Sequence, residues 1–277
     1  MGQFFETWSD RVRVVLGQNP GVMTGPGTNT YLVGTDDPIL IDTGAGLAAY
    51  DAHLKGALAE AGLPLPRTVL ITHSHPDHLG GAESILRFSP EATIHKFARP
   101  GGEEPFDTPF TPLSDGKIFR TEGATIEAIY TPGHANDHSV FFLHEERALF
   151  TGDLILGMGT VVIPLAGGNM AHYLASLERL LERDLSRIFP GHGPLIPDAR
   201  AKIDEYLAHR RMREEQVFDS VRRGVGEPGR IVEEIYAEIP AVLHPAAEQS
   251  VRQHLRKLAE EQRVIDRGQG LYEIADP

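Results

Sequence analysis

Cysteine is absent from this chain of 277 residues. Its absence excludes disulfide bonds, thiolate metal ligands and a cysteine nucleophile. Long apolar runs are also absent: no stretch reaches the roughly eighteen apolar residues that a membrane-spanning helix needs. The first residues, MGQFFETWSD, combine no basic stretch with an apolar one, so we expect no secretion signal. A cytoplasmic protein that makes no contact with membranes is therefore expected.

Positive charge is scarce as well. The chain has 26 Lys and Arg residues against 39 Asp and Glu residues, a formal net charge of −13. Such a surface does not attract polyanions broadly, so a nucleic-acid partner would need a local basic patch. The hydrophobic fraction of 41% and the charged fraction of 23% are typical of globular proteins. The length suits one large domain, or a catalytic domain with a small companion.

The first part of the chain mixes short β-branched segments with helical ones. Strands are predicted at residues 11–16, 30–34, 38–42, 67–75, 91–97, 123–134, 138–145, 147–153 and 186–194. Helices are predicted at residues 46–63, 79–88 and 169–184. The order is neither strict βαβ alternation nor all-β. It favours an α/β (α+β) fold in which two mixed sheets pack together with helices outside. Residues 98–122, rich in Pro, Gly and Asp, are predicted to form a long surface loop.

The pattern changes near residue 198. A long amphipathic helix is predicted over 198–224, followed by helices at 229–239 and 244–264. A small hairpin that turns at Gly268–Gly270 follows. Helices followed by a glycine-turned hairpin are the outline of a winged helix. We therefore predict a catalytic domain over 1–197 and a long helix plus winged helix over 198–277.

The segment THSHPDH places four potential metal ligands at the exit of a predicted strand: His73, His75, Asp77 and His78. Neutral imidazole and carboxylate are good ligands for zinc, which accepts nitrogen and oxygen donors together. The alternative is a polar surface loop with incidental histidines, which rarely has such density. Four ligands alone cannot complete two metal sites.

Three further candidates follow other predicted strands: His134 in YTPGH, Asp153 in LFTGD and His192 in IFPGH. Each is preceded by glycine, which lets the backbone turn sharply. Any one of them alone could equally be a cap or a turn residue. Together with the HxHxDH segment, all three predict a binuclear metal site.

The order THSHPDH, TPGH, TGD and PGHGP resembles the metallo-β-lactamase superfamily of di-metal hydrolases. The resemblance implies an αββα sandwich with the site at one edge between the sheets. It also implies two Zn²⁺ ions, with iron or manganese as alternatives. In the implied ligand set, one metal takes His73, His75 and His134, the other takes Asp77, His78 and His192, and Asp153 bridges them. The true β-lactamases have cysteine or serine at the bridging position, so the aspartate places this chain with glyoxalase II, RNase Z and related hydrolases.

A closer resemblance covers nearly the whole chain. The segments RVVLGQNPGVMTGPGTNTYLVGT, LIDTGAG, RTEGATIEAIYTPGH and GDLILGMGT, with the predicted winged helix, resemble the β-lactamase-like protein 2 branch. The characterised animal member of that branch is an endoribonuclease. Fungal polyketide-releasing thioesterases share GTNTYLVG and the same ligand set. The resemblance therefore implies the fold and the site, whereas the substrate does not transfer with them.

The resemblance also implies a mechanism, in which a hydroxide that bridges the metals attacks a carbonyl carbon or a phosphorus atom. Asp77 is then a catalytic residue that accepts a hydrogen bond from the nucleophile. Asp42 would orient a ligand histidine, with a structural turn as the alternative. His138 and Asn29 are candidate substrate contacts, with packing and strand structure as their alternatives. The histidines that fit no ligand spacing are expected at the surface or in packing roles: His53, His95, His144, His172, His209, His244 and His254.

Three functions remain open at this level. The first is hydrolysis of a small ester, thioester, lactone or amide. The second is cleavage of single-stranded RNA, for which the tail offers cations at Arg252, Arg256, Lys257, Arg263 and Arg267. The third is a DNA-binding regulator with a sensing metal site, which would not need seven ligands. The expected partner is therefore a small molecule or single-stranded RNA, and the oligomeric state is open, with a homodimer as one option.

Overall fold

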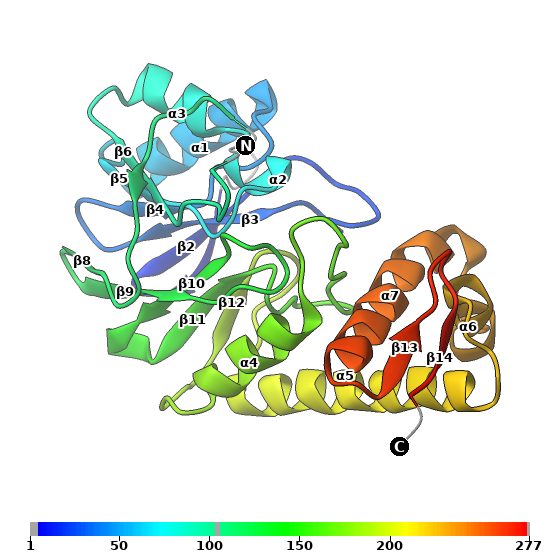
Figure 1. Cartoon of the computed structure of the whole chain (residues 1–277). Coiled ribbons are helices and arrows are strands. Elements are labelled where there is room, and N and C mark those ends of the chain that lie inside the picture. The colour runs from blue at the N-terminus through cyan, green and yellow to red at the C-terminus, as the bar shows by residue number, and fades with distance from the viewer. Residues whose placement is uncertain (1–4, 103–105, 276–277) are drawn as a thin grey trace.

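The computed structural model describes residues 5–102 and 106–275 and contains two β-sheets that pack face to face (Figure 1). The first sheet runs in sequence order through β1 (Glu6–Ser9), β2 (Val12–Leu16), β3 (Asn29–Val33), β4 (Ile39–Ile41), β5 (Thr68–Leu70), β6 (Thr93–Lys96) and β7 (Thr111–Pro112). The second has the order β12 (Ile188–Pro190), β11 (Ala148–Gly152), β10 (Ser139–Leu143), β9 (Ala124–Tyr130) and β8 (Ile118–Thr121). Both sheets mix parallel and antiparallel pairs, as the sequence pattern predicted.

Helices cover the outer face of each sheet (Figure 1). The first sheet carries α1 (Ala48–Ala61), α2 (Pro76–Leu79) and α3 (Ala82–Phe88), and the second carries α4 (Met170–Leu180) and the start of α5 (Ala199–Arg222). A short 3₁₀ turn, η1 (His144–Glu146), links β10 to β11. The predicted αββα sandwich is therefore confirmed.

The central strands are buried on both faces because both faces are covered. In β10, Phe141 and Leu143 enter the layer between the sheets, whereas Val140 and Phe142 face the helices. Successive side chains of a strand point to opposite faces, so an uninterrupted apolar run suits a strand between two layers. The run SVFFL in β10 has this form, and all five residues are buried.

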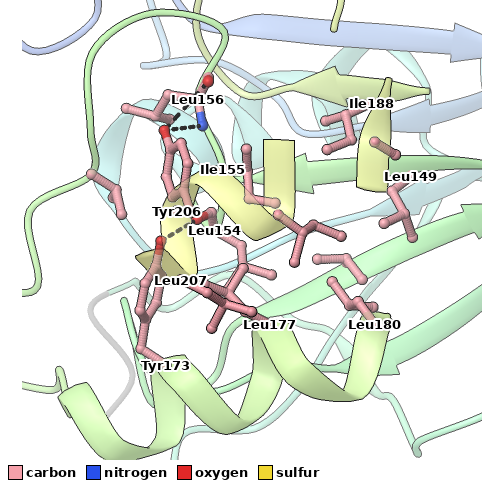
Figure 2. Packing of buried hydrophobic residues seen from close by; sticks show 14 of the residues in the cluster. Leu149, Leu154, Ile155, Leu156, Tyr173, Leu177, Leu180, Ile188, Tyr206 and Leu207 are labelled. Carbon is pink, nitrogen blue, oxygen red and sulfur yellow. Dashed lines mark hydrogen bonds between the residues drawn. The ribbon is translucent and has the colours of Figure 1, made fainter. Parts of the chain in front are cut away.

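Figure 2 shows the helical layer under the second sheet, where α4 and α5 pack on the strands. Tyr173 and Leu177 of α4 and Tyr206 and Leu207 of α5 are buried against Leu149 of β11. Burial of each such side chain contributes about 1.5–3 kcal/mol. This layer fixes the first half of α5 to the sandwich.

The second half of α5 belongs to a separate apolar cluster. There Val217 and Val221 pack with residues of α6 (Pro228–Ile235) and α7 (His244–Glu260) and with the hairpin of β13 (Val264–Asp266) and β14 (Tyr272–Ile274). The short 3₁₀ turn η2 (Ala241–Leu243) precedes α7. This arrangement confirms the winged helix. Because one helix enters both cores, the division between residues 197 and 198 stays a prediction.

One local prediction was wrong, and one strand was not predicted. The predicted loop over 98–122 contains β7 and β8, whose residues are mostly exposed or half-buried, so no apolar run marked them. Strand β1 was not predicted, since it too is an edge strand with little burial. Its Trp8 nonetheless stacks on Phe189, with ring centroids 6.0 Å apart.

Within residues 5–102 and 106–275, no helix combines the length and the apolar character needed to cross a membrane.

Candidate metal centre

The HxHxDH segment connects β5 to α2. His73 and His75 lie in the loop between them, and Asp77 and His78 lie in the first turn of α2, which Pro76 opens. Proline at the first helical position fixes the backbone where no amide hydrogen is needed. His73 and His78 are fully buried. Polar groups at such depth need partners, and the remaining predicted ligands supply them.

Three other strand ends approach this loop. His134 follows β9, Asp153 follows β11 and His192 follows β12. Glycine is required for each of these approaches. Gly133 has a φ of 147°, and a Cβ on it would lie 2.3 Å from Cα of Tyr173. Gly152 has a φ of 45°, and a Cβ on it would lie 2.6 Å from Oγ1 of Thr72. A Cβ on Gly191 would lie 2.9 Å from Oδ1 of Asp153.

The loop that follows Asp153 is held by the helical layer, as Figure 2 shows. The hydroxyl of Tyr173 donates to the carbonyl of Leu154 at 2.8 Å. The backbone N–H of Leu156 donates to the hydroxyl of Tyr206 at 3.1 Å. The helices thus fix the backbone on which Asp153 lies.

Four side chains form a first group of ligand atoms: His73, His75, His134 and Asp153. Nδ1 of His75 lies 2.9 Å from Nε2 of His73 and 2.9 Å from Nε2 of His134. One proton on His75 cannot serve both contacts, because it can point to only one nitrogen at a time. A cation that accepts lone pairs from all three nitrogens fits this arrangement.

Asp77, His78 and His192 form the second group. Oδ2 of Asp77 lies 3.4 Å from Nε2 of His78 and 3.2 Å from Nε2 of His192. Asp153 faces both groups, with Oδ1 3.3 Å from His78 and Oδ2 3.7 Å from His134. Within the described residues, Nε2 of His78 and Oδ1 of Asp153 are buried without a hydrogen-bond partner. This donor set also fits a cation.

The other ring nitrogen of each buried histidine is held from behind. Nδ1 of His134 contacts the carbonyl of Val162 at 2.8 Å, and Nδ1 of His192 lies 3.4 Å from the carbonyl of Gly27. A carbonyl accepts only, so in each case Nδ1 carries a proton, and Nε2 is the nitrogen that can bind a cation. Such outer contacts fix the ring orientation that ligation needs.

Thr72 and Asp42 fix the other two buried rings. The hydroxyl of Thr72 donates to Asp42 and lies 3.0 Å from Nδ1 of His73. Asp42 also contacts Nδ1 of His78 at 2.8 Å. Its φ of 59° is unusual for a residue other than glycine. Such a backbone persists where the surroundings over-determine it, as three hydrogen-bonded groups do here.

Protonation differs between the two groups. Burial lowers the pKa of His134 to about 4, and burial with the neighbouring imidazoles lowers the pKa of His73 well below its usual range. Burial would also lower the pKa of His192, but Asp153 and Asp77 outweigh it and raise that pKa to about 9. The first group thus presents neutral imidazoles near pH 7, whereas the second holds protons that a cation must displace.

The two candidate substrate contacts lie beside the ligands. The amide nitrogen of Asn29 donates to the carbonyls of Pro190 and Gly193 at 2.9 and 2.8 Å, so it holds the loop that carries His192. His138 is fully buried, with its ring centroid 5.1 Å from that of His73. These placements favour positioning for Asn29 and packing for His138. Their contact with substrate stays a prediction.

Two residues that contact the ligand set were not predicted from the sequence. Thr28 donates to Oδ2 of Asp77 at 3.0 Å, and Thr72 links Asp42 to His73. Their only sequence signal was adjacency to Asn29 and to the HxHxDH segment. Within the described residues, the histidines without ligand spacing join neither group of ligands. One of them, His254, is buried against Glu214 at 3.3 Å in the C-terminal module.

Residues 23–192 match the family described as "Metallo-beta-lactamase superfamily", and residues 228–271 match the "Beta-lactamase associated winged helix domain". The chain belongs to the metallo-β-lactamase superfamily. It is thus a metal-dependent hydrolase by family, and its winged helix is the one associated with this fold. Both domain types expected from the sequence are therefore confirmed.

Similar proteins cover nearly the whole chain. The Drosophila melanogaster "Beta-lactamase-like protein 2 homolog" is 39% identical over 89% of this chain and 87% of its own length. The "Atrochrysone carboxyl ACP thioesterase nsrC" of Aspergillus novofumigatus is 37% identical over 92% of this chain and 81% of its own. The resemblance to the β-lactamase-like protein 2 branch is confirmed.

Solved structures extend the likeness to the fold. The metallo-β-lactamase family protein TTHA1429 from Thermus thermophilus matches with a TM-score of 0.77 and 25% identity, covering 97% of this chain and 100% of that one. TTHA1623, solved in a di-iron-bound form, matches with a TM-score of 0.51 and 29% identity over 66% of this chain and 96% of its own. A protein with a similar fold has thus been solved with two iron ions bound.

Proposed function

We propose that the chain is a di-zinc hydrolase that cleaves a small ester, thioester, lactone or amide. The convergence of seven side chains from separate strand ends into two groups of ligand atoms carries this proposal. His73, His75 and His134 hold one cation, Asp77, His78 and His192 hold the other, and Asp153 lies between them. Nitrogen and oxygen donors without sulfur suit zinc, while iron and manganese suit the same set.

When bound, two cations polarise a carbonyl and lower the pKa of water to about 7. The side chains of this chain orient the reactants. The carboxylate of Asp77 receives a hydrogen bond from Thr28 on Oδ2, and burial, which would raise its pKa, is outweighed by His78 and His192, which lower it. Asp77 therefore stays ionised at neutral pH and can accept a hydrogen bond from the nucleophile, the catalytic role expected from the sequence.

Exposed apolar side chains near the centre favour a small organic substrate. Val22 and Met23 lie in the loop between β2 and β3, and Met158 lies in the loop after Asp153. Both loops bond to the segment of His192: Gly157 donates to its carbonyl at 2.8 Å, and Gly27 lies against its ring. Exposed apolar groups that gather beside a site favour apolar ligands. The thioesterase name of one relative agrees with this substrate class.

The alternative, cleavage of single-stranded RNA, needs free cations, and those of the tail are engaged. Each pairs with a carboxylate in the C-terminal module: Arg252 with Glu248, Arg256 with Glu260, Lys257 with Glu214 and Glu261, Arg263 with Glu215, and Arg267 with Glu273. Paired charges present little net field to a phosphate chain. The same pairing argues against a DNA-binding regulator.

One assay separates the substrate classes. The zinc-loaded chain is offered a panel of thioesters, lactones and esters and, separately, an unstructured RNA, at low and high salt. We expect turnover of a small substrate that changes little with salt. RNA cleavage that weakens steeply with salt would contradict the proposal, because such dependence reports phosphate contacts.

A further inference from the structure

Residues 161–168 lie between the metal centre and the C-terminal module. Near the start of the segment, the carbonyl of Val162 contacts Nδ1 of the ligand His134 at 2.8 Å. Further along, Ala166 and Gly167 line a cavity of about 150 Å³ together with His75 and Arg99. The segment therefore supports one ligand and forms a wall beside another.

Gln253 of α7 clamps this segment. Its amide nitrogen donates to the carbonyl of Pro164 at 2.7 Å and to that of Gly168 at 3.0 Å. The side chain is only 1% exposed, so water does not compete for these bonds. Both carbonyls lie at the ends of the turn that contains Ala166 and Gly167. One side-chain amide thus closes the turn that forms the wall.

Two neighbours reinforce the clamp. The N–H of Leu165 donates to Oε1 of Gln249, one helical turn before Gln253, at 3.3 Å. Arg210 of α5, 2% exposed, donates to the carbonyl of Val161. The segment is therefore held at its start, middle and end by side chains of the long helix and the winged helix.

In a winged helix that binds nucleic acid, α7 would be the helix that contacts it. In this chain α7 instead packs against other parts of the protein. One face of α7 buries Val251 and Leu255 in the core of the module, and Gln253 turns toward the catalytic domain. Figure 1 shows α7 between the sandwich and the β13–β14 hairpin. Such placement leaves α7 as a structural support of the active site.

We propose that Gln253 is a positioning residue for the hydrolase reaction, which holds residues 161–168 as the wall of the substrate cavity beside His75. The proposal rests on the proposed function for its reaction. The wall limits the size of the group that the cavity admits. Loss of the clamp frees the turn from Pro164 to Gly168, whereas Arg210 still holds Val161 beside Val162. Substrate binding therefore weakens while the ligand set stays.

The test compares Gln253→Met, which keeps the size of the side chain and removes its donors, with Arg256→Met on the exposed side of α7. Hydrogen exchange of residues 161–169 is measured on the full chain with zinc. We expect exchange about tenfold faster in Gln253→Met than in the wild type or Arg256→Met, because the local opening free energy falls. Unchanged exchange would overturn the proposal.

Kinetics on the small substrate supply the second readout. Gln253→Met should raise KM about fivefold and change kcat less than about twofold, the pattern of lost binding without lost chemistry. Ala166→Phe, which fills the cavity without touching α7, should raise KM while exchange stays as in the wild type. An unchanged KM in both variants, with exchange faster in Gln253→Met, would overturn the role of the wall. If the wild type hydrolyses nothing in the panel, the proposed function fails, and exchange alone decides whether Gln253 positions the segment.

Discussion

The carboxylate of Asp42 lies 2.8 Å from Nδ1 of His78 and accepts the backbone N–H of Thr72 at 2.8 Å through its other oxygen. This contact links the end of β4 to the second group of ligand atoms and to the start of the HxHxDH loop. Asp42 is buried, so water does not compete for its contacts with His78 and Thr72. It orients the ring of His78 with Nε2 toward Asp153 and Asp77.

Replacement of Asp42 by alanine should weaken zinc binding at the second group about 10–100-fold, since outer contacts of this kind tune metal affinity by that factor. Competition with a chromophoric chelator measures the affinity of each site. Asp51→Asn is the control, because Asp51 bonds to Ser84 away from the ligands. Equal affinities in Asp42→Ala and the control would contradict the role given to Asp42.

Replacement of Asn29 by alanine should destabilise the loop that carries His192. The carbonyl of Gly193 loses its donor, whereas that of Pro190 keeps the hydroxyl of Tyr31. A buried acceptor without a partner costs about 1–3 kcal/mol. The temperature of thermal unfolding and the zinc affinity measured by titration should both fall. A variant that keeps its stability and zinc affinity but has a raised KM would instead favour the substrate contact expected from the sequence.

Replacement of His75 by alanine should remove metal and turnover while the fold remains. His75 is half-buried at the edge of the sandwich and belongs to none of the apolar clusters of the described residues. Substitutions outside a core usually change stability by less than about 1 kcal/mol. Circular dichroism checks that the fold remains, and metal analysis checks that the metal is lost. Wholesale unfolding would count against the placement of the site.

Zinc binding should depend on pH differently at the two groups. In the metal-free chain burial would lower the pKa of His192, yet Asp153 and Asp77 raise it to about 9, so a proton must leave when zinc binds. Burial lowers the pKa of His134 to about 4, so it is already neutral near pH 7. Affinity at the second group should therefore rise with pH up to about 9, about tenfold per unit for each proton released.

Affinity at the first group should change little across the same range. Calorimetric titration in buffers of different ionisation enthalpy counts the protons released at each step. Release of equal numbers of protons at both steps would show that the groups do not differ as described.

The sequence predicted the architecture because its signals are local. Apolar runs such as SVFFL mark strands between two covered faces, and Gly268–Gly270 marks the hairpin. Three edge strands were not predicted, for the opposite reason. Strands β1, β7 and β8 bury little, so composition did not distinguish them from a loop.

The grouping of the seven candidate ligands was predictable because they follow strand ends in short motifs, three of them directly after a glycine. The supporting contacts were not, since they join residues far apart in the chain. Gln253 reaches Pro164 across 89 positions, and Asn29 reaches Pro190 across 161. A single sequence gives no signal for such pairs. Each residue is compatible with its own helix or strand whether or not the distant contact forms.

The central claim is that Asp153 and six further side chains hold two metal ions in one site. The most direct test is the metal content of the purified, active chain, measured by inductively coupled plasma mass spectrometry beside His134→Ala and His192→Ala. The account predicts two equivalents of metal per chain in the wild type and a loss of about one in each variant. Full hydrolytic activity in a wild-type chain that retains no metal after chelation would contradict it.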